Sequence, residues 1–128
     1  MQIMYVEDDQ DDQELFGELV KEIDPNHEII FASTGMEALE MLKSDLLHLP
    51  DIIFLDVNLP MIDGYQTLIE MRKIERLRDI KVVFLSTAIN PATTLKHKDC
   101  LENVMFCKKA SSYDEAKENV RVALKLSE

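Results

Sequence analysis

Five short apolar runs recur along the chain, and stretches with helical periodicity separate them. Within each run the apolar side chains are nearly continuous instead of alternating with polar ones, which is typical of strands covered on both faces. We therefore expect strands at residues 3–6, 28–32, 52–55, 82–85 and 104–107. Their alternation with helices predicts an α/β domain in which helices cover both faces of a parallel sheet.

The segments between these runs carry helix signals. In the first segment, apolar residues at positions 16, 19, 20 and 23 form one helical stripe, and Pro25 marks its end. Further helices are expected to begin after four residues that suit an N-cap: Thr34, Asp63, Asn90 and Ser112. The complete pattern predicts (βα)₅ in one domain of residues 1–128, with ligands near the carboxyl ends of the strands.

Polar residues directly follow four of the predicted strands and carry the candidate chemistry. Because parallel strands present their carboxyl ends at one edge of the sheet, we expect their carboxylates, hydroxyl and ammonium groups to share one crevice. These residues are Glu7-Asp8-Asp9 after the first strand, Asp56 after the third, Ser86-Thr87 after the fourth and Lys108-Lys109 after the fifth.

Such a crevice predicts phosphoryl transfer onto an aspartate. Clustered carboxylates repel one another and favour a bound cation, and oxygen ligands with room for water suit Mg²⁺. A lysine can contact both carboxylate and phosphoryl oxygens. A carboxylate can attack phosphorus while the cation and the lysine stabilise charge on the transferring group.

The chain resembles the receiver domain of two-component response regulators over essentially its full length. The matching stretches are Val6-Glu7-Asp8, residues 54–64, Ser86-Thr87 and Phe106-Cys107-Lys108-Lys109. The resemblance implies a doubly wound, flavodoxin-like fold with strand order 2-1-3-4-5. It also implies a single-domain response regulator that signals through protein contacts. Such a domain is not a classical enzyme, although it assists its own phosphorylation and dephosphorylation.

Carried over to this sequence, the resemblance makes Asp56 the phosphoacceptor. Mg²⁺ is then the expected cofactor, held by Glu7, Asp8, Asp56 and the backbone carbonyl of Asn58. The acidic residues that follow Asp8 are interpreted differently, because a helix N-terminus stabilises negative charge. We expect that structural role for Asp9, Asp11, Asp12 and Glu14.

Three further roles follow from the resemblance. Ser86 is the expected switch hydroxyl, preferred to Thr87 because it comes first after the apolar run. Lys109 is the expected contact of the phosphoryl group, preferred to Lys108 because Phe106 then lies three residues before it. Phe106 is the expected aromatic side chain that changes rotamer with the switch, although a plain core role is almost equally compatible with its position.

The charge composition of the chain limits the classes of partner that we expect it to bind. With 25 acidic and 14 basic residues, the formal net charge is −11, which disfavours nucleic acids and anionic membranes. The first residues lack the pattern of a secretory signal, so we expect a cytoplasmic protein. The expected partners are a histidine kinase or phosphotransfer protein and an unknown downstream protein, and the expected state is a monomer or weak dimer.

Two other classes of function have sites with some of these residues. The first is an interaction module of the same fold that works without phosphorylation. The second is a phosphatase with an aspartyl nucleophile. We rank the phosphatase low because hydrolases that resemble this site commonly need a second acid two residues beyond the nucleophile, where this chain has Asn58.

Overall fold

Five parallel strands form the central sheet of the computed structural model, which describes residues 1–44, 48–86 and 103–127. Neighbouring strands lie in the order β2-β1-β3-β4-β5, as expected, and the order reverses between β1 and β3. The strands are β1 (Gln2–Val6), β2 (Glu28–Ala32), β3 (Ile52–Asp56), β4 (Lys81–Ser86) and β5 (Val104–Lys108).

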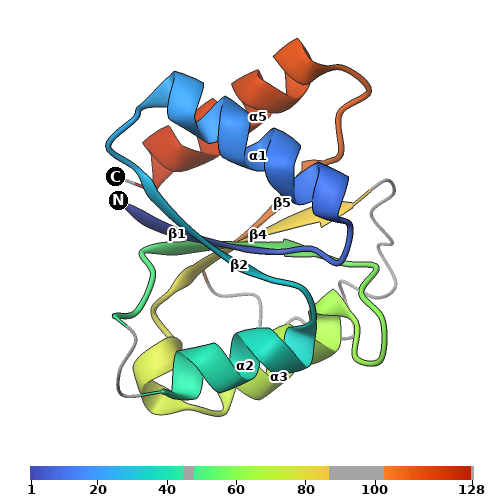
Figure 1. The fold of residues 1–128 in the computed structure, drawn as a ribbon. Helices are drawn as coiled ribbons and strands as arrows, with labels where there is room; N and C mark the ends of the chain where they lie inside the picture. The colour runs from blue at the N-terminus through green and yellow to red at the C-terminus, as the bar shows by residue number, and fades with distance from the viewer. Residues whose placement is uncertain (45–47, 87–102, 128) are drawn as a thin grey trace.

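Helices cover both faces of this sheet. Figure 1 shows α1 and α5 side by side on one face and α2 and α3 together on the opposite face. Their bounds are α1 (Gln10–Ile23), α2 (Gly35–Lys43), α3 (Gly64–Arg72) and α5 (Tyr113–Leu126), and a 3₁₀ turn, η1 (Glu75–Leu77), follows α3. The helix expected after Asn90 lies outside the described residues. No helix in the described part of the chain is long and apolar enough to cross a membrane.

The helix starts confirm the predicted N-caps within the described residues. The side chain of Thr34 accepts a hydrogen bond from the Glu37 N–H, and the side chain of Ser112 does the same for Glu115. Asp63 and Gln66 form a reciprocal capping box at the start of α3. Each cap satisfies N–H groups that have no partner inside the helix, and so fixes where the helix leaves the sheet edge.

The apolar core forms two clusters, one on each face of the sheet. In β3, Ile53 and Leu55 belong to the cluster beneath α2 and α3, whereas Ile52 and Phe54 belong to the cluster beneath α1 and α5. All of β3 is buried. Burial on both faces explains why the strand sequences are continuously apolar rather than alternating.

Strand ends and one helix face differ from the sequence prediction. Strands β3 and β4 extend one residue further than expected, so Asp56 and Ser86 are strand residues held by the ladder. The sequence after Asp63 predicts a helix with an apolar stripe of Tyr65, Leu68 and Ile69. In α3 the buried apolar side chains are instead those of Tyr65, Leu68 and Met71, and Ile69 is only half-buried. The core side of α3 is therefore rotated slightly from the predicted stripe.

Gly64 allows α3 to begin against the backbone of β3. A Cβ at position 64 would overlap the carbonyl oxygen of Asp56. Gly64→Ala should therefore lower the free energy of unfolding by about 1–3 kcal/mol, because the backbone on both sides resists movement. Urea denaturation of the purified chain measures this change.

Gly17→Ala is the matched control. A Cβ at position 17 would lie 3.5 Å from Cζ of Phe31, an ordinary contact distance, and the residue is inside α1. Alanine is favoured over glycine inside a helix by about 0.5–1 kcal/mol. The control variant should be as stable as the wild type or more so. Equal stability of Gly64→Ala and Gly17→Ala would contradict the proposed close approach.

Candidate functional site

Residues at the carboxyl ends of β1, β3, β4 and β5 converge at one edge of the sheet. Glu7 follows β1 directly, and its backbone N–H donates to the carbonyl oxygen of Ala32 at 3.0 Å. Asp56 ends β3 and Ser86 ends β4. Glu7, Asp56 and Ser86 are only 2%, 3% and 3% exposed. The structure thus buries polar side chains at the strand ends, where the sequence predicts the crevice.

Lys109 lies among the carboxylates of this edge. Its Nζ is 3.2 Å from Oδ2 of Asp56 and 3.3 Å from Oε2 of Glu7. Its backbone N–H donates to the carbonyl oxygen of Ser86 at 2.7 Å, so the chain stays in register with β4 just beyond β5. Lys108, by contrast, is exposed. The structure therefore brings Lys109, and not Lys108, to Asp56.

Three carboxylates have the composition of a cation site. One carboxylate oxygen from each of Glu7, Asp8 and Asp56 can be chosen so that all lie within 4.8 Å of one another. Oxygen donors of this kind suit Mg²⁺ or Mn²⁺. Asp8 is exposed while its two neighbours are buried, which leaves one side open to water. These residues fit a hydrated divalent cation.

Burial and proximity shift the pKa values at the site. Burial, followed by a hydrogen bond with Asp56 and the charge of that carboxylate, raises the pKa of Glu7 from its ordinary value of 4.5 to about 8, although the Lys109 ammonium opposes this. For Lys109, burial lowers the pKa, but the carboxylates of Asp56 and Glu7 outweigh it and raise the pKa overall. Lys109 is therefore held in its charged form beside Asp56.

The loop after β3 holds Asp56 in place. The backbone N–H of Asn58 donates to Oδ1 of Asp56 at 3.1 Å. The Gly64 N–H donates to the carbonyl oxygen of Val57 at 2.9 Å, which closes the loop against the strand. Met61 adopts a left-handed backbone with φ of 67° at the exposed turn. The predicted metal contact of the Asn58 carbonyl stays a prediction.

The two expected switch residues occupy neighbouring strands. Ser86 is buried at the end of β4, and the alternative Thr87 lies outside the described residues. Phe106 is half-buried in β5, and its ring stacks on Phe84 at a centroid distance of 5.5 Å. It packs against the core beneath α2 and α3, so it occupies a core position in this conformation. Its change of rotamer stays a prediction.

Asp12 has a contact that the sequence interpretation missed. Asp9 caps α1 by accepting hydrogen bonds from the N–H groups of Asp11 and Asp12, which agrees with the expected role at a helix N-terminus. Oδ2 of Asp12 also lies 3.9 Å from Nζ of Lys109. The first turn of α1 begins just after the Glu7-Asp8 pair. Residues four apart lie on the same side of a helix, so the position of Asp12, four residues beyond Asp8, could have suggested that its side chain faces the site.

Comparison with known proteins identifies the family of this chain. A family model described as response regulator receiver domain matches residues 3–121. The chain is 35% identical over 92 residues to response regulator Rcp1 of Synechocystis sp., an alignment that covers 69% of this chain and 63% of Rcp1. The chain thus spans less than two thirds of the length of this relative.

Two solved structures are similar over nearly the whole chain. The phosphorylated cyanobacterial phytochrome response regulator RcpA has a TM-score of 0.83 and 30% identity, with 98% of this chain and 91% of that chain covered. The Mn²⁺-bound form of response regulator Rcp1 has a TM-score of 0.80 and 28% identity, with 94% of this chain and 89% of that chain covered.

The raised pKa of Glu7 predicts that stability falls with rising pH when divalent cations are removed. The folded chain keeps a proton on Glu7 up to a pH of about 8, whereas the unfolded chain releases it near 4.5. The folded state then binds more protons in this window, so the free energy of unfolding decreases as pH rises through it. In EDTA, Glu7→Gln should match the wild type near about pH 5 and melt several degrees higher near about pH 8.5.

Glu14→Gln provides the control, because it removes an exposed carboxylate of α1. This variant should follow the wild-type melting profile across the same pH range. Thermal melts monitored by circular dichroism measure all three chains. A difference between wild type and Glu7→Gln that does not grow with pH would contradict the assigned proton.

Proposed function

Because this chain belongs to the response regulator receiver domain family, we propose that it is a phosphorylation-controlled signalling domain whose phosphoacceptor is Asp56. One observation carries the proposal. The Asp56 carboxylate is buried at the end of β3, and the Lys109 ammonium lies 3.2 Å from its Oδ2 atom. This pair combines a nucleophilic oxygen with a fixed positive charge for an incoming phosphoryl group.

The proposed reaction transfers a phosphoryl group from a donor histidine. An Asp56 oxygen attacks phosphorus, the new P–O bond forms as the P–N bond to the donor breaks, and the imidazole leaves with the bonding electrons and takes a proton from solvent. The Asn58 N–H holds Oδ1 at 3.1 Å and so orients the carboxylate for attack. Lys109 stabilises negative charge on the transferring group.

Glu7, Asp8 and Asp56 are the proposed side-chain ligands of Mg²⁺, with the Asn58 carbonyl as a further ligand. Their clustered oxygens support this assignment, as does the Mn²⁺-bound form of the similar Rcp1. When bound, Mg²⁺ supplies positive charge against the oxygens of the phosphoryl group. The chain itself supplies the nucleophile, the lysine and the backbone donor.

The proposed switch follows from the direct link between Lys109 and β4. Phosphorylation adds negative charge beside Lys109, whose backbone N–H is bonded to the Ser86 carbonyl oxygen. A movement of the Ser86 hydroxyl or of Lys109 toward the phosphoryl group would therefore alter the ends of β4 and β5. Phe106, which stacks on Phe84 between these strands, is the proposed side chain that responds.

The proposed donor is a histidine kinase or phosphotransfer protein in the cytoplasm, and residues 1–128 act as one receiver domain. The phosphorylated form passes the signal to a downstream protein by contact. An interaction module that has lost the chemistry is the alternative. The buried Asp56 and Glu7 and the partly buried Lys109 argue against it, because charged groups without a function are costly at a buried strand edge.

Intact mass measures the proposed reaction. After incubation with Mg²⁺ and acetyl phosphate, the wild type should gain one phosphoryl group, and Asp56→Asn should gain none because its amide is not a nucleophile. A metal-free sample should also remain unmodified. Asp63→Asn is the matched control, since asparagine also suits an N-cap and this variant should be modified like the wild type.

An adduct on Asp56→Asn would contradict the assigned phosphoacceptor. A wild-type chain that neither gains mass nor releases inorganic phosphate from acetyl phosphate would favour the interaction module. Release of inorganic phosphate that depends on Asp56 would instead agree with rapid hydrolysis of the acyl phosphate.

Asp12→Asn should accelerate phosphoryl uptake from acetyl phosphate. The substitution removes a negative charge that faces the anionic donor and contacts Lys109 at 3.9 Å. For a partly exposed pair, we expect a rate increase of about two- to fivefold at low salt, and this increase should shrink near about 1 M salt. Intact mass against time at two salt concentrations measures it.

Asp11→Asn is the control for this effect. Both residues lie in the first turn of α1, so each substitution removes the same charge from the helix N-terminus. Of the two, Asp12 lies at ion-pair distance from Lys109. Equal rates for the two variants, or an increase that does not depend on salt, would contradict a direct effect on the site.

A further inference from the structure

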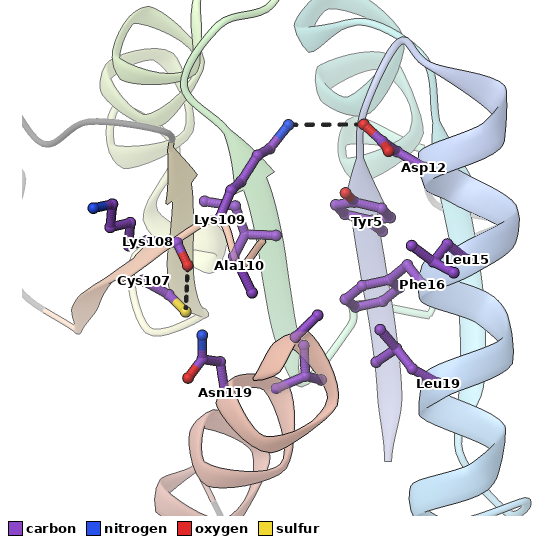
Figure 2. A pocket seen from close by; sticks show the side chains of 13 residues that line it. Tyr5, Asp12, Leu15, Phe16, Leu19, Cys107, Lys108, Lys109, Ala110 and Asn119 are labelled. Atoms are coloured by element: carbon purple, nitrogen blue, oxygen red, sulfur yellow. Dashed lines mark hydrogen bonds and ion pairs between the residues drawn. The ribbon is translucent and has the colours of Figure 1, made fainter. Parts of the chain in front are cut away.

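A cavity lies between α1 and α5, directly below the site. Its volume is about 120 Å³, and mainly apolar side chains line it. Figure 2 shows the aromatic rings of Tyr5 and Phe16 on one side, with Leu19 further along α1. The two rings stack at a centroid distance of 4.1 Å, and both side chains are buried. The cavity therefore has one wall of fixed aromatic surface.

Small side chains leave this space open on the opposite side. Ala110 and Ala116 line the cavity at the loop after β5 and in the first turns of α5. Val120 closes it further along the same helix. An apolar space of this size is a poor site for water, which needs several polar partners, whereas an engineered apolar cavity of about 150 Å³ binds benzene. The dimensions suit one six-membered ring.

The mouth of the cavity is polar, and Asp12 and Lys109 lie there. Lys108 and Asn119 also line the cavity, and Figure 2 shows the Lys108 side chain pointing away from it. Figure 2 shows Lys109 and Asp12 joined across it, and the Tyr5 hydroxyl points toward this pair. Lys109 already contacts the carboxylates of Glu7 and Asp56. A ligand carboxylate would compete with these acids for one ammonium group, so the mouth favours a neutral group that both donates and accepts hydrogen bonds.

We propose that this cavity binds a small neutral aromatic molecule that carries a hydroxyl group, with the ring between α1 and α5 and the hydroxyl at the Asp12–Lys109 pair. The ring gains apolar contact with Phe16 and Val120. The hydroxyl can donate to Asp12 and accept from Lys109. The binding site is separate from the proposed phosphoacceptor, and binding does not require phosphorylation of Asp56.

Phenol is the probe for this site. Titration of the ¹⁵N-labelled full chain should give saturable shifts of the backbone amides of Phe16, Leu19, Ala116 and Val120. The dissociation constant should be about 1 mM or lower, a range open to a ligand of so few atoms. Benzoate should bind at least about tenfold more weakly, because its carboxylate would compete with Glu7, Asp12 and Asp56 for the Lys109 ammonium.

Ala116→Leu fills the cavity and should weaken phenol binding at least about tenfold. Val122→Leu also enlarges a side chain of α5 but on its exposed surface, so phenol binding should remain unchanged. If Ala116→Leu lacks a dispersed spectrum, Ala116→Val replaces it and should weaken binding by a smaller factor. Shifts that do not saturate, shifts centred elsewhere, or equal binding by the filled variant and Val122→Leu would overturn the proposal.

Discussion

Repulsion among carboxylates at the carboxyl edge of the sheet is the constraint on which this structure depends. Glu7 and Asp56 are buried at the ends of adjacent strands, and Asp8 lies beside them. Buried like charges are costly unless other groups compensate for them. Lys109 provides one compensating charge, and the N–H of Asn58 bonds to the Asp56 carboxylate. Without a cation, the raised pKa of Glu7 keeps that side chain protonated up to a pH of about 8. The remaining negative charge makes the edge suitable for a cation and, with it, an incoming phosphoryl group.

The doubly wound sheet makes such an arrangement possible because its layers fix the strand ends. Cores on both faces hold β3 in place, and the close approach of Gly64 positions α3 against the backbone of Asp56. The backbone bond from Lys109 to Ser86 ties the charged side chain to the neighbouring strand. The charged side chain of Lys109 is thus linked to β5 through the chain itself and to β4 through one backbone hydrogen bond. This link is the physical basis of the proposed switch.

Much of this arrangement is readable from the sequence because the strongest signals are local. Continuous apolar runs mark the buried strands, and Asp63 marks the start of α3 by its capping chemistry. Side-chain packing between elements is not local, so Met71 rather than Ile69 completes the buried face of α3. The contact from Asp12 to Lys109 also depends on how α1 and β5 meet across the sheet edge. The cavity between α1 and α5 has the same origin, since neither helix sequence specifies the space left between them.

A crystal structure of the chain grown with Mn²⁺, which shares the oxygen-donor preference of Mg²⁺, tests most directly whether these carboxylates bind a cation. Anomalous scattering locates the ion without reference to the expected ligands. We expect a peak bounded by carboxylate oxygens of Glu7, Asp8 and Asp56 and by the carbonyl oxygen of Asn58. An empty edge in crystals that contain Mn²⁺, or an ion held by other residues, would contradict a cation as the group that balances these carboxylates.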